Sequence, residues 1–163
     1  MTILGIDPGL SGALAFIDGA SVRVYDMPVL SLKRNGKAKN EPDFLELARI
    51  IREVEGVPSF AVVEQVSAMP GQGVSSMFAF GKTYGGILGV LAALSIRTEL
   101  VAPVAWKRWH RIKPDSGKDA SRAAAKNLFP HQAGLFARVK DDGRADATLI
   151  ASWGLHQTKE LAA

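Results

Sequence analysis

The feature that most restricts the fold is a short apolar run that contains one carboxylate. Residues 60–66 are apolar except for Glu64 and Gln65. A run this short and this apolar is typical of a central β-strand that is covered on both faces. The glutamate has no obvious structural partner there, and burying its charge is costly unless a cation neutralises it. The run therefore predicts a covered sheet with a charged site on one of its strands.

The other periodic segments complete an α/β domain. Further strands are predicted over residues 2–6, 13–17, 21–27 and 98–102, with Asp18-Gly19 as a hairpin turn. Helices are predicted over residues 42–55, 75–94, 103–109, 119–128 and 145–156. A polar loop centred on Asn35-Gly36 is predicted before the first helix. The order of elements indicates one mixed five-stranded sheet with helices on both faces.

Length and composition restrict the class of protein. The 163 residues suit a single domain over residues 1–163, and 47% hydrophobic with 22% charged residues indicate a globular chain. The absence of cysteine excludes disulfides, thiolate zinc sites and a cysteine nucleophile. No basic leader precedes the first apolar run, and no apolar stretch is long enough for a bilayer. We therefore expect a cytoplasmic protein that has no membrane partner.

Positive charge is concentrated in part of the chain. The formal net charge is +4, but residues 97–140 alone contain ten cations and three acids. Residues 33–39 add four cations and no acid. Such a distribution is typical either of a solvated face or of a surface that binds phosphates.

Four acids stand where a metal site could form. Asp7 ends the first predicted strand, and Glu64 lies in the apolar run. Asp142 and Asp146 are four residues apart, which places them on one face of a helix. Grouped carboxylates can hold Mg²⁺, and two such ions support phosphodiester hydrolysis. Structural explanations stay open: a turn cap for Asp7, a helix N-cap for Asp142 and a favourable first-turn charge for Asp146.

Three motifs resemble those of the RuvC-type Holliday junction resolvases. Gly5-Ile6-Asp7-Pro8-Gly9, with Gly12 following, is similar to the first motif of that family. Val63-Glu64-Gln65-Val66 is similar to the second motif, and Gly143-Arg144-Ala145-Asp146-Ala147 to the last helix. The order and spacing agree over residues 2–153. The Asp-Gly-Arg-Ala-Asp form looks more like the phage and prophage branch than the cellular enzymes.

The resemblance implies a fold, an activity and an assembly. The fold is ribonuclease H-like, and the protein is a homodimer with two Mg²⁺ ions in each active site, where Mn²⁺ can substitute. The activity is that of a crossover junction endodeoxyribonuclease, which makes paired nicks in a four-way DNA junction and leaves 5′ phosphates. The implied location is the bacterial cytoplasm or nucleoid.

The resemblance also assigns catalytic residues. Asp7, Glu64 and Asp146 match the metal-binding carboxylates of the family. The family places its remaining ligand three residues before the last aspartate, where this chain has Gly143. We therefore prefer Asp142 as the fourth ligand, and Asp141 stays as the alternative.

Lys107, Lys118 and the position of Met69 are DNA contacts by the same resemblance, whereas the other predicted contacts come from the excess of cations over residues 97–140. Lys118, at the start of a predicted helix, is similar to a family lysine near the scissile phosphate and is assigned a catalytic role as well. Met69 takes the place of an aromatic wedge that some members carry after the second motif. Trp106 and Trp109 are candidates for the core. The predicted DNA-binding residues are Lys107, Arg108, Arg111, Lys113, Lys118, Arg122 and Met69.

Several alternatives stay open at this point. The chain could cut other branched DNA or RNA–DNA hybrids, or it could bind junctions without cutting them. Asp-Pro-Gly-Leu-Ser-Gly also faintly resembles a phosphate loop of the sugar kinase and actin superfamily, whose second lobe does not fit in 163 residues. The helix over residues 75–94 contains four glycines and is the candidate dimer contact, with packing inside one chain as the alternative.

Overall fold

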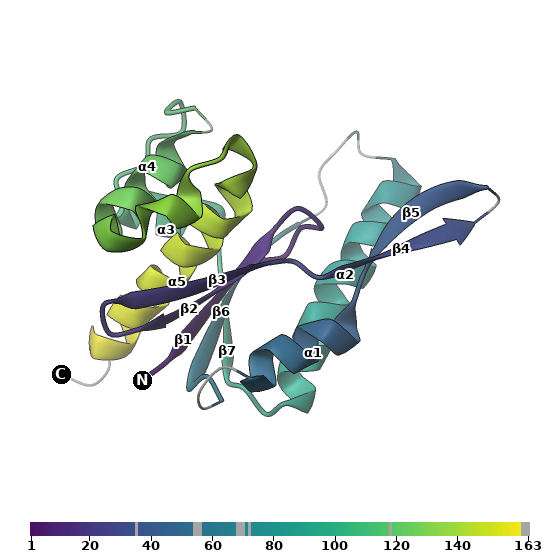
Figure 1. Cartoon of the computed structure of the whole chain (residues 1–163), viewed down its shortest axis with the longest axis horizontal. Helices are drawn as coiled ribbons and strands as arrows, with labels where there is room; N and C mark the ends of the chain where they lie inside the picture. Colours follow the sequence, from purple (N-terminus) through teal and green to yellow (C-terminus); the bar gives the residue numbers. More distant parts are fainter. Residues whose placement is uncertain (35, 54–56, 68–70, 72, 118, 161–163) are drawn as a thin grey trace.

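A mixed five-stranded sheet forms the centre of the chain (Figure 1). The computed structural model describes residues 1–34, 36–53, 57–67, 71, 73–117 and 119–160. The sheet has the order β3-β2-β1-β6-β7; β1, β2 and β3 are antiparallel neighbours, whereas β6 is parallel to both β1 and β7. The predicted sheet is thus confirmed. Its strands are β1 (Ile3–Asp7), β2 (Ala13–Asp18), β3 (Ser21–Asp26), β6 (Phe60–Glu64) and β7 (Thr98–Val101).

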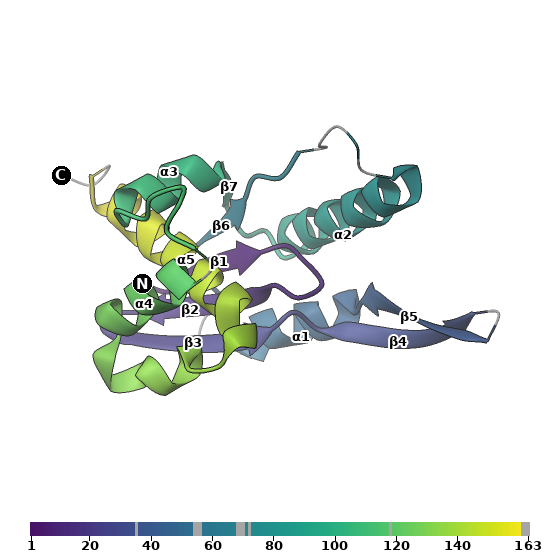
Figure 2. The ribbon, with the colours of Figure 1, turned by 90° about the horizontal axis from the view of Figure 1, so that it is seen from above.

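Helices cover both faces of the sheet, as predicted (Figures 1 and 2). One face is covered by α1 (Phe44–Glu53) and α2 (Val74–Ala93). The other is covered by α3 (Pro103–Trp109), α4 (Asp119–Leu128) and α5 (Asp142–Glu160). Two short 3₁₀ helices, η1 (Pro130–Phe136) and η2 (Val139–Asp141), lead into α5.

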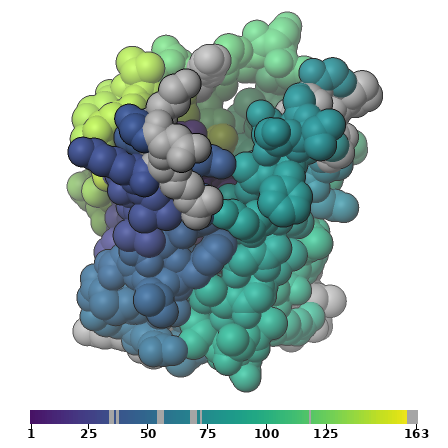
Figure 3. Space-filling model, turned by 90° about the vertical axis from the view of Figure 1, so that its right-hand side faces the viewer, coloured from purple at the N-terminus to yellow at the C-terminus, as the bar shows by residue number. Residues whose placement is uncertain are grey.

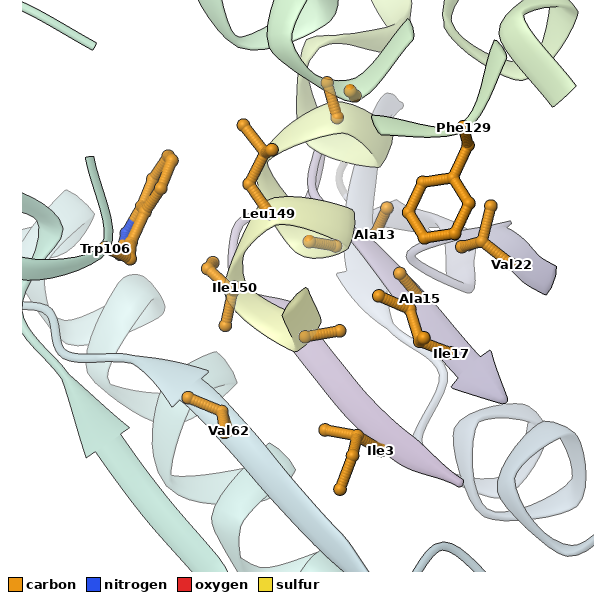
Figure 4. Close-up of a cluster of buried hydrophobic side chains, with 14 of the residues drawn as sticks. Ile3, Ala13, Ala15, Ile17, Val22, Val62, Trp106, Phe129, Leu149 and Ile150 are labelled. Carbon is orange, nitrogen blue, oxygen red and sulfur yellow. The ribbon is translucent and has the colours of Figure 1, made fainter. Parts of the chain in front are cut away.

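Alternation along the strands divides the core into two layers. Ile3 and Val62 point into the cluster on the α5 side, which Figure 4 shows together with Trp106. Their neighbours Leu4 and Val63 point into the cluster beneath α1 and α2. β1 and β6 are therefore buried on both faces, which is why their sequences are continuous apolar runs.

Glycines let α5 approach the sheet at backbone distance. A Cβ atom added to Gly5 in β1 would lie 2.2 Å from the carbonyl oxygen of Ala147 and 2.4 Å from the nitrogen of Ala151. A Cβ added to Gly154 would lie 2.4 Å from Val62 Cγ2. Since real atoms do not approach so closely, only glycine permits this packing. The position of α5 over β1 is consequently fixed along its length.

The predicted polar loop before the first helix is wrong. The chain there forms a two-stranded antiparallel sheet of β4 (Val29–Arg34) and β5 (Lys37–Pro42), which projects from the body of the molecule (Figure 2). Gly36 has a φ of 73°, as the primed hairpin turns require. Residues 29–33 and 38–40 of these strands are exposed, so no buried face there imposes the alternating pattern by which strands are recognised in a sequence.

Two helix boundaries also differ from the prediction. Pro42 is the last residue of β5, and Asp43 caps α1 because its Oδ1 accepts the N–H of Glu46 at 3.0 Å. The last helix begins at Asp142, three residues earlier than predicted. Within the described residues, no helix is long and apolar enough to cross a membrane.

Candidate active site

Three acids from separate segments converge at one edge of the sheet. Asp7 is the last residue of β1 and Glu64 the last residue of β6. Because these strands are parallel, with Ile6 opposite Val63, their carboxyl ends lie side by side. Asp146 lies in the first turns of α5, which packs against β1. The structure therefore brings the three predicted residues into one region.

The electrostatics of the three acids show that they share one site. Burial raises the pKa of Asp7 to about 7, and the charges of Asp146 and Glu64 add to this rise. Burial also raises the pKa of Glu64, against a hydrogen bond from Trp106. Burial likewise raises the pKa of Asp146, against a hydrogen bond from Ser121. Such a crowded group of carboxylates favours either protonation or a bound cation.

The two candidates for a fourth ligand have different surroundings. Asp142 lines the same cleft as Asp146, and its charge helps to raise the pKa of Asp146. Asp141 is 1% exposed and is held by Arg138, which donates hydrogen bonds of 3.0 and 2.7 Å to its Oδ1. These partners satisfy Asp141 in a structural role. The geometry favours Asp142.

Gly143 has a steric reason to be glycine. A Cβ at this position would lie 2.6 Å from the carbonyl oxygen of Ser11 and 2.9 Å from the Cα of Gly12. The start of α5 therefore packs directly on the turn that follows Asp7. An aspartate at position 143, where the resemblance places the fourth ligand, does not fit in this chain.

Two neighbouring residues of α3 support the acids. Trp106 is fully buried, and its Nε1–H donates to Glu64 Oε1 at 3.0 Å. Lys107 lies with its Nζ 5.1 Å from the centre of the Trp106 ring. Burial has the largest effect on the pKa values of Asp7, Glu64 and Asp146 and raises them. The charge of Lys107 acts in the opposite direction and lowers all three. Lys107, predicted as a DNA contact, thus lies beside the acids themselves.

Asp142 and Asp146 open into a cleft, whose lining does not include Asp7 or Glu64. The cleft has a volume of about 530 Å³. Figure 3 shows a hollow between the teal of α2 and the green of the later segments, but no residue of α2 lines the cleft itself. The residues that line the cleft are Lys107, Ile112, Lys113, Pro114, Gly117, Ser121, Asp142 and Asp146.

Besides Lys107 and Arg122, five residues are predicted to bind DNA. Arg108, Arg111 and Lys113 are exposed along the segment that follows Lys107. Lys118 and Met69 lie outside the described residues.

Arg122 is a correction. It is 8% exposed, forms an ion pair with Asp119, and places Nε 2.9 Å from Asp142 Oδ1. Arg122 is therefore paired with two acids beneath the surface and is not exposed as the predicted DNA contact requires.

The oxygen atoms of the site suit a hard divalent cation. Asp146 Oδ1 is buried and accepts no hydrogen bond from the described residues. Within the same residues, no three His, Cys, Asp or Glu side chains are grouped tightly enough to hold an ion as they stand. Mg²⁺ is commonly bound by only one or two carboxylates, with water and phosphate oxygens completing its shell. The donor set therefore fits cations whose coordination is completed by a phosphate substrate.

Comparison with known proteins identifies a sequence relative. No family model matches the chain. Over 103 residues, the chain is 34% identical to "Holliday junction resolvase MOC1, chloroplastic" from Chlamydomonas reinhardtii. The match covers 63% of this chain but only 12% of that protein, so the chain spans about an eighth of the length of its relative.

Solved structures decide the fold. The chain matches a structure titled "T. thermophilus RuvC in complex with Holliday junction substrate" with a TM-score of 0.67 and 12% identity. The match covers 98% of this chain and 96% of that one. A second structure of Thermus thermophilus RuvC matches with a TM-score of 0.60 and 14% identity over the same shares. The chain has the ribonuclease H-like fold of RuvC. The predicted fold is confirmed, and the phage-like branch stays a prediction.

The sequence alone reveals some of the site residues but not all of them. Asp7 and Glu64 follow from strand ends, and Asp146 from its helical spacing. Trp106 was missed as a partner of Glu64, although a buried indole N–H always needs an acceptor. Its position next to Lys107, in a stretch where two tryptophans flank two cations, is the signal that the sequence offers.

Proposed function

We propose that this chain is a divalent-metal-dependent endonuclease that resolves four-way DNA junctions. The observation that carries the proposal is the convergence of Asp7, Glu64 and Asp146, largely buried, next to a cleft that Lys107 and Lys113 help to line. The RuvC fold and the similarity to a junction resolvase support this substrate over the other nucleic acids. Paired nicks that leave 5′ phosphates are the expected products.

In this proposal, Asp7, Glu64, Asp142 and Asp146 hold two Mg²⁺ ions, and Mn²⁺ substitutes for them. When bound, the ions lower the pKa of water and stabilise the leaving oxygen. Trp106 orients Glu64 through its N–H, and Arg122 orients Asp142.

Cations on the rim of the cleft hold the substrate in the proposed complex. Lys107 is placed to offset negative charge at the scissile phosphate, because its charge already reaches all three central acids. Lys118 is proposed for the same phosphate from its sequence position. Arg108, Arg111 and Lys113 are proposed to contact the backbone of the adjoining duplex arm, and Met69 to act as the wedge.

We further propose a homodimer formed through α2. Val74 and Phe78 on this helix are 85% and 77% exposed. Gly81, Gly85 and Gly89 are exposed on the same helix, and no described atom would lie within 4 Å of a Cβ added to any of them. Glycine inside a helix costs about 1 kcal/mol relative to alanine, so close approach by a second chain accounts for them. Two-fold symmetry presents two sites to two strands of a junction.

The test compares cleavage and binding by wild type, Asp7→Asn and Glu64→Gln. Labelled four-way junctions, flaps and RNA–DNA hybrids are incubated with Mg²⁺ or Mn²⁺, and binding is measured separately in EDTA. We expect wild type to cut the junction fastest and each variant to cut it at least about 100-fold more slowly while binding is kept. Asp18→Asn, at an exposed acid outside the cleft, is the control and retains cleavage.

Each result decides between named alternatives. Cleavage that survives both Asp7→Asn and Glu64→Gln rejects the proposed site. Faster cleavage of flaps or hybrids rejects the junction as preferred substrate. Junction binding by wild type without any cleavage favours a binding protein that does not cut.

A further inference from the structure

Two helices of the chain end in the same backbone motif. At the end of α2, the N–H of Ser95 donates to Ala92 O at 2.9 Å and the N–H of Ile96 to Leu91 O at 3.0 Å. At the end of α3, the N–H of Arg111 donates to Arg108 O and that of Ile112 to Lys107 O, both at 2.9 Å. These are the hydrogen bonds of a Schellman motif, which turns the chain through one left-handed residue.

The left-handed residue of each motif is not glycine. Ser95 has a φ of 57° and Arg111 a φ of 59°, and within the described chain they alone combine a positive φ with a side chain. Glycine is the usual residue at this position because a Cβ is unfavourable there. Arg111 therefore retains a long cationic side chain at a position where the backbone favours none.

The surroundings of Arg111 suggest why the arginine is kept. Arg111 lines a groove of about 690 Å³ that contains four cations, three apolar side chains and no acid. The groove shares Lys107, Ile112, Lys113 and Pro114 with the carboxylate cleft. The lining residues are Val104, Lys107, Arg108, Arg111, Ile112, Lys113 and Pro114.

The continuity of groove and cleft defines a path for one polyanion. A strand whose scissile phosphate lay at the carboxylates would pass from the cleft to the groove over the residues that line both. In the groove it would meet cations, with no described acid among the lining residues. A line of negative charges with regular spacing, such as a phosphodiester backbone, matches this arrangement.

We propose that this groove binds the backbone of the cut DNA strand beside the scissile phosphate, and that Arg111 is kept in its left-handed conformation to provide the cation there. The inference rests on the proposed nuclease function, which it deepens by giving the strand a direction out of the cleft. Ser95 provides the internal comparison, because the same motif occurs there without a cation and outside the groove.

The test separates fold stability from DNA binding in matched variants. Arg111→Gly and Ser95→Gly both relieve a left-handed Cβ, so both are expected to raise the thermal midpoint by about 2–4 °C. In EDTA, Arg111→Gly is expected to bind a four-way junction about tenfold more weakly. The slope of the logarithm of affinity against the logarithm of salt concentration is expected to fall by about one, as for the loss of one phosphate contact. Arg111→Lys retains most of the affinity, and Ser95→Gly binds like wild type.

A second measurement locates the contact. Junctions that carry one neutral methylphosphonate at successive positions are bound by wild type and by Arg111→Gly in EDTA. We expect one or two positions, next to the scissile phosphate, at which the neutral group weakens binding by the wild type but not by the variant. Equal loss at every position for both proteins, or unchanged binding by Arg111→Gly, overturns the groove proposal. Because no cleavage is needed, failure of the nuclease proposal appears separately, as wild type that binds but does not cut.

Discussion

The two faces of the central sheet are built in different ways. On the α5 side, backbone meets backbone at Gly5, Gly154 packs on the side chain of Val62, and the candidate catalytic acid Asp146 is carried by the helix that packs there. On the α2 side, Gly86 packs against Phe44, but Gly85 points away from the described chain. One face uses glycine to fix an acid against the sheet, whereas the other leaves small residues uncovered. If the proposed dimer forms through α2, close packing inside the chain and contact with a second chain use opposite faces of the sheet.

The largest expected effect tests the closely packed face. Gly5→Ala places a methyl group 2.2 Å from the Ala147 carbonyl oxygen, so α5 must move away from β1. We expect a loss of about 3 kcal/mol or more in the free energy of unfolding, measured by urea denaturation in metal-free buffer. Cleavage by any folded fraction falls too, since Asp146 moves with α5.

The matched control for this change is Gly89→Ala on α2. A Cβ at Gly89 has no described atom within 4 Å, so this variant is expected to keep or slightly raise stability. Equal denaturation midpoints for Gly5→Ala and wild type would contradict the close approach of α5.

The next effect concerns the stability of the carboxylate cluster without metal. Asp7 ordinarily titrates at pH 3.8, whereas burial and neighbouring charges raise its pKa in the fold to about 7. The stability contributed by protonated Asp7 is therefore complete below pH 3.8 and is lost as the pH rises through 7. Asp7→Asn is expected to stabilise the metal-free chain by about 2 kcal/mol at pH 8 and by much less at pH 5.

Chemical denaturation at both pH values, with and without Mg²⁺, checks this prediction. Mg²⁺ is expected to stabilise wild type and to have little effect on Asp7→Asn. Asp115→Asn, at an exposed acid, is the control and changes stability little at either pH. If Asp7→Asn is less stable than wild type at pH 8, the ionised carboxylate of Asp7 stabilises the metal-free fold, contrary to the prediction.

The smallest expected effect tests the uncovered face. Gly85 is exposed and a Cβ added there has no described atom within 4 Å, so we expect the single chain to keep its stability in Gly85→Leu. A partner that approaches α2 closely is displaced by it, and we expect dimer dissociation to become about tenfold more favourable, which is about 1.4 kcal/mol. Sedimentation velocity over a concentration series measures this equilibrium. An unchanged equilibrium in a dimeric protein would place the dimer contact elsewhere.

The same difference between the faces explains what the sequence could predict. The strands that end in Asp7 and Glu64 were recognisable because burial on both sides makes them continuously apolar. The β4–β5 hairpin was missed because its exposed strands follow no buried face. Arg122 resembled a surface cation, since nothing local in the sequence shows that α4 turns it towards Asp142.

The hydrogen bond between Trp106 and Glu64 has an optical consequence. Trp106 is fully buried, and its indole N–H has a carboxylate of the site as acceptor. The emission of an indole depends on the charge near its ring, so a change in the charge or orientation of Glu64 alters the light that Trp106 emits. The chain thus contains an intrinsic fluorophore whose signal is expected to change when the proposed metal site is filled.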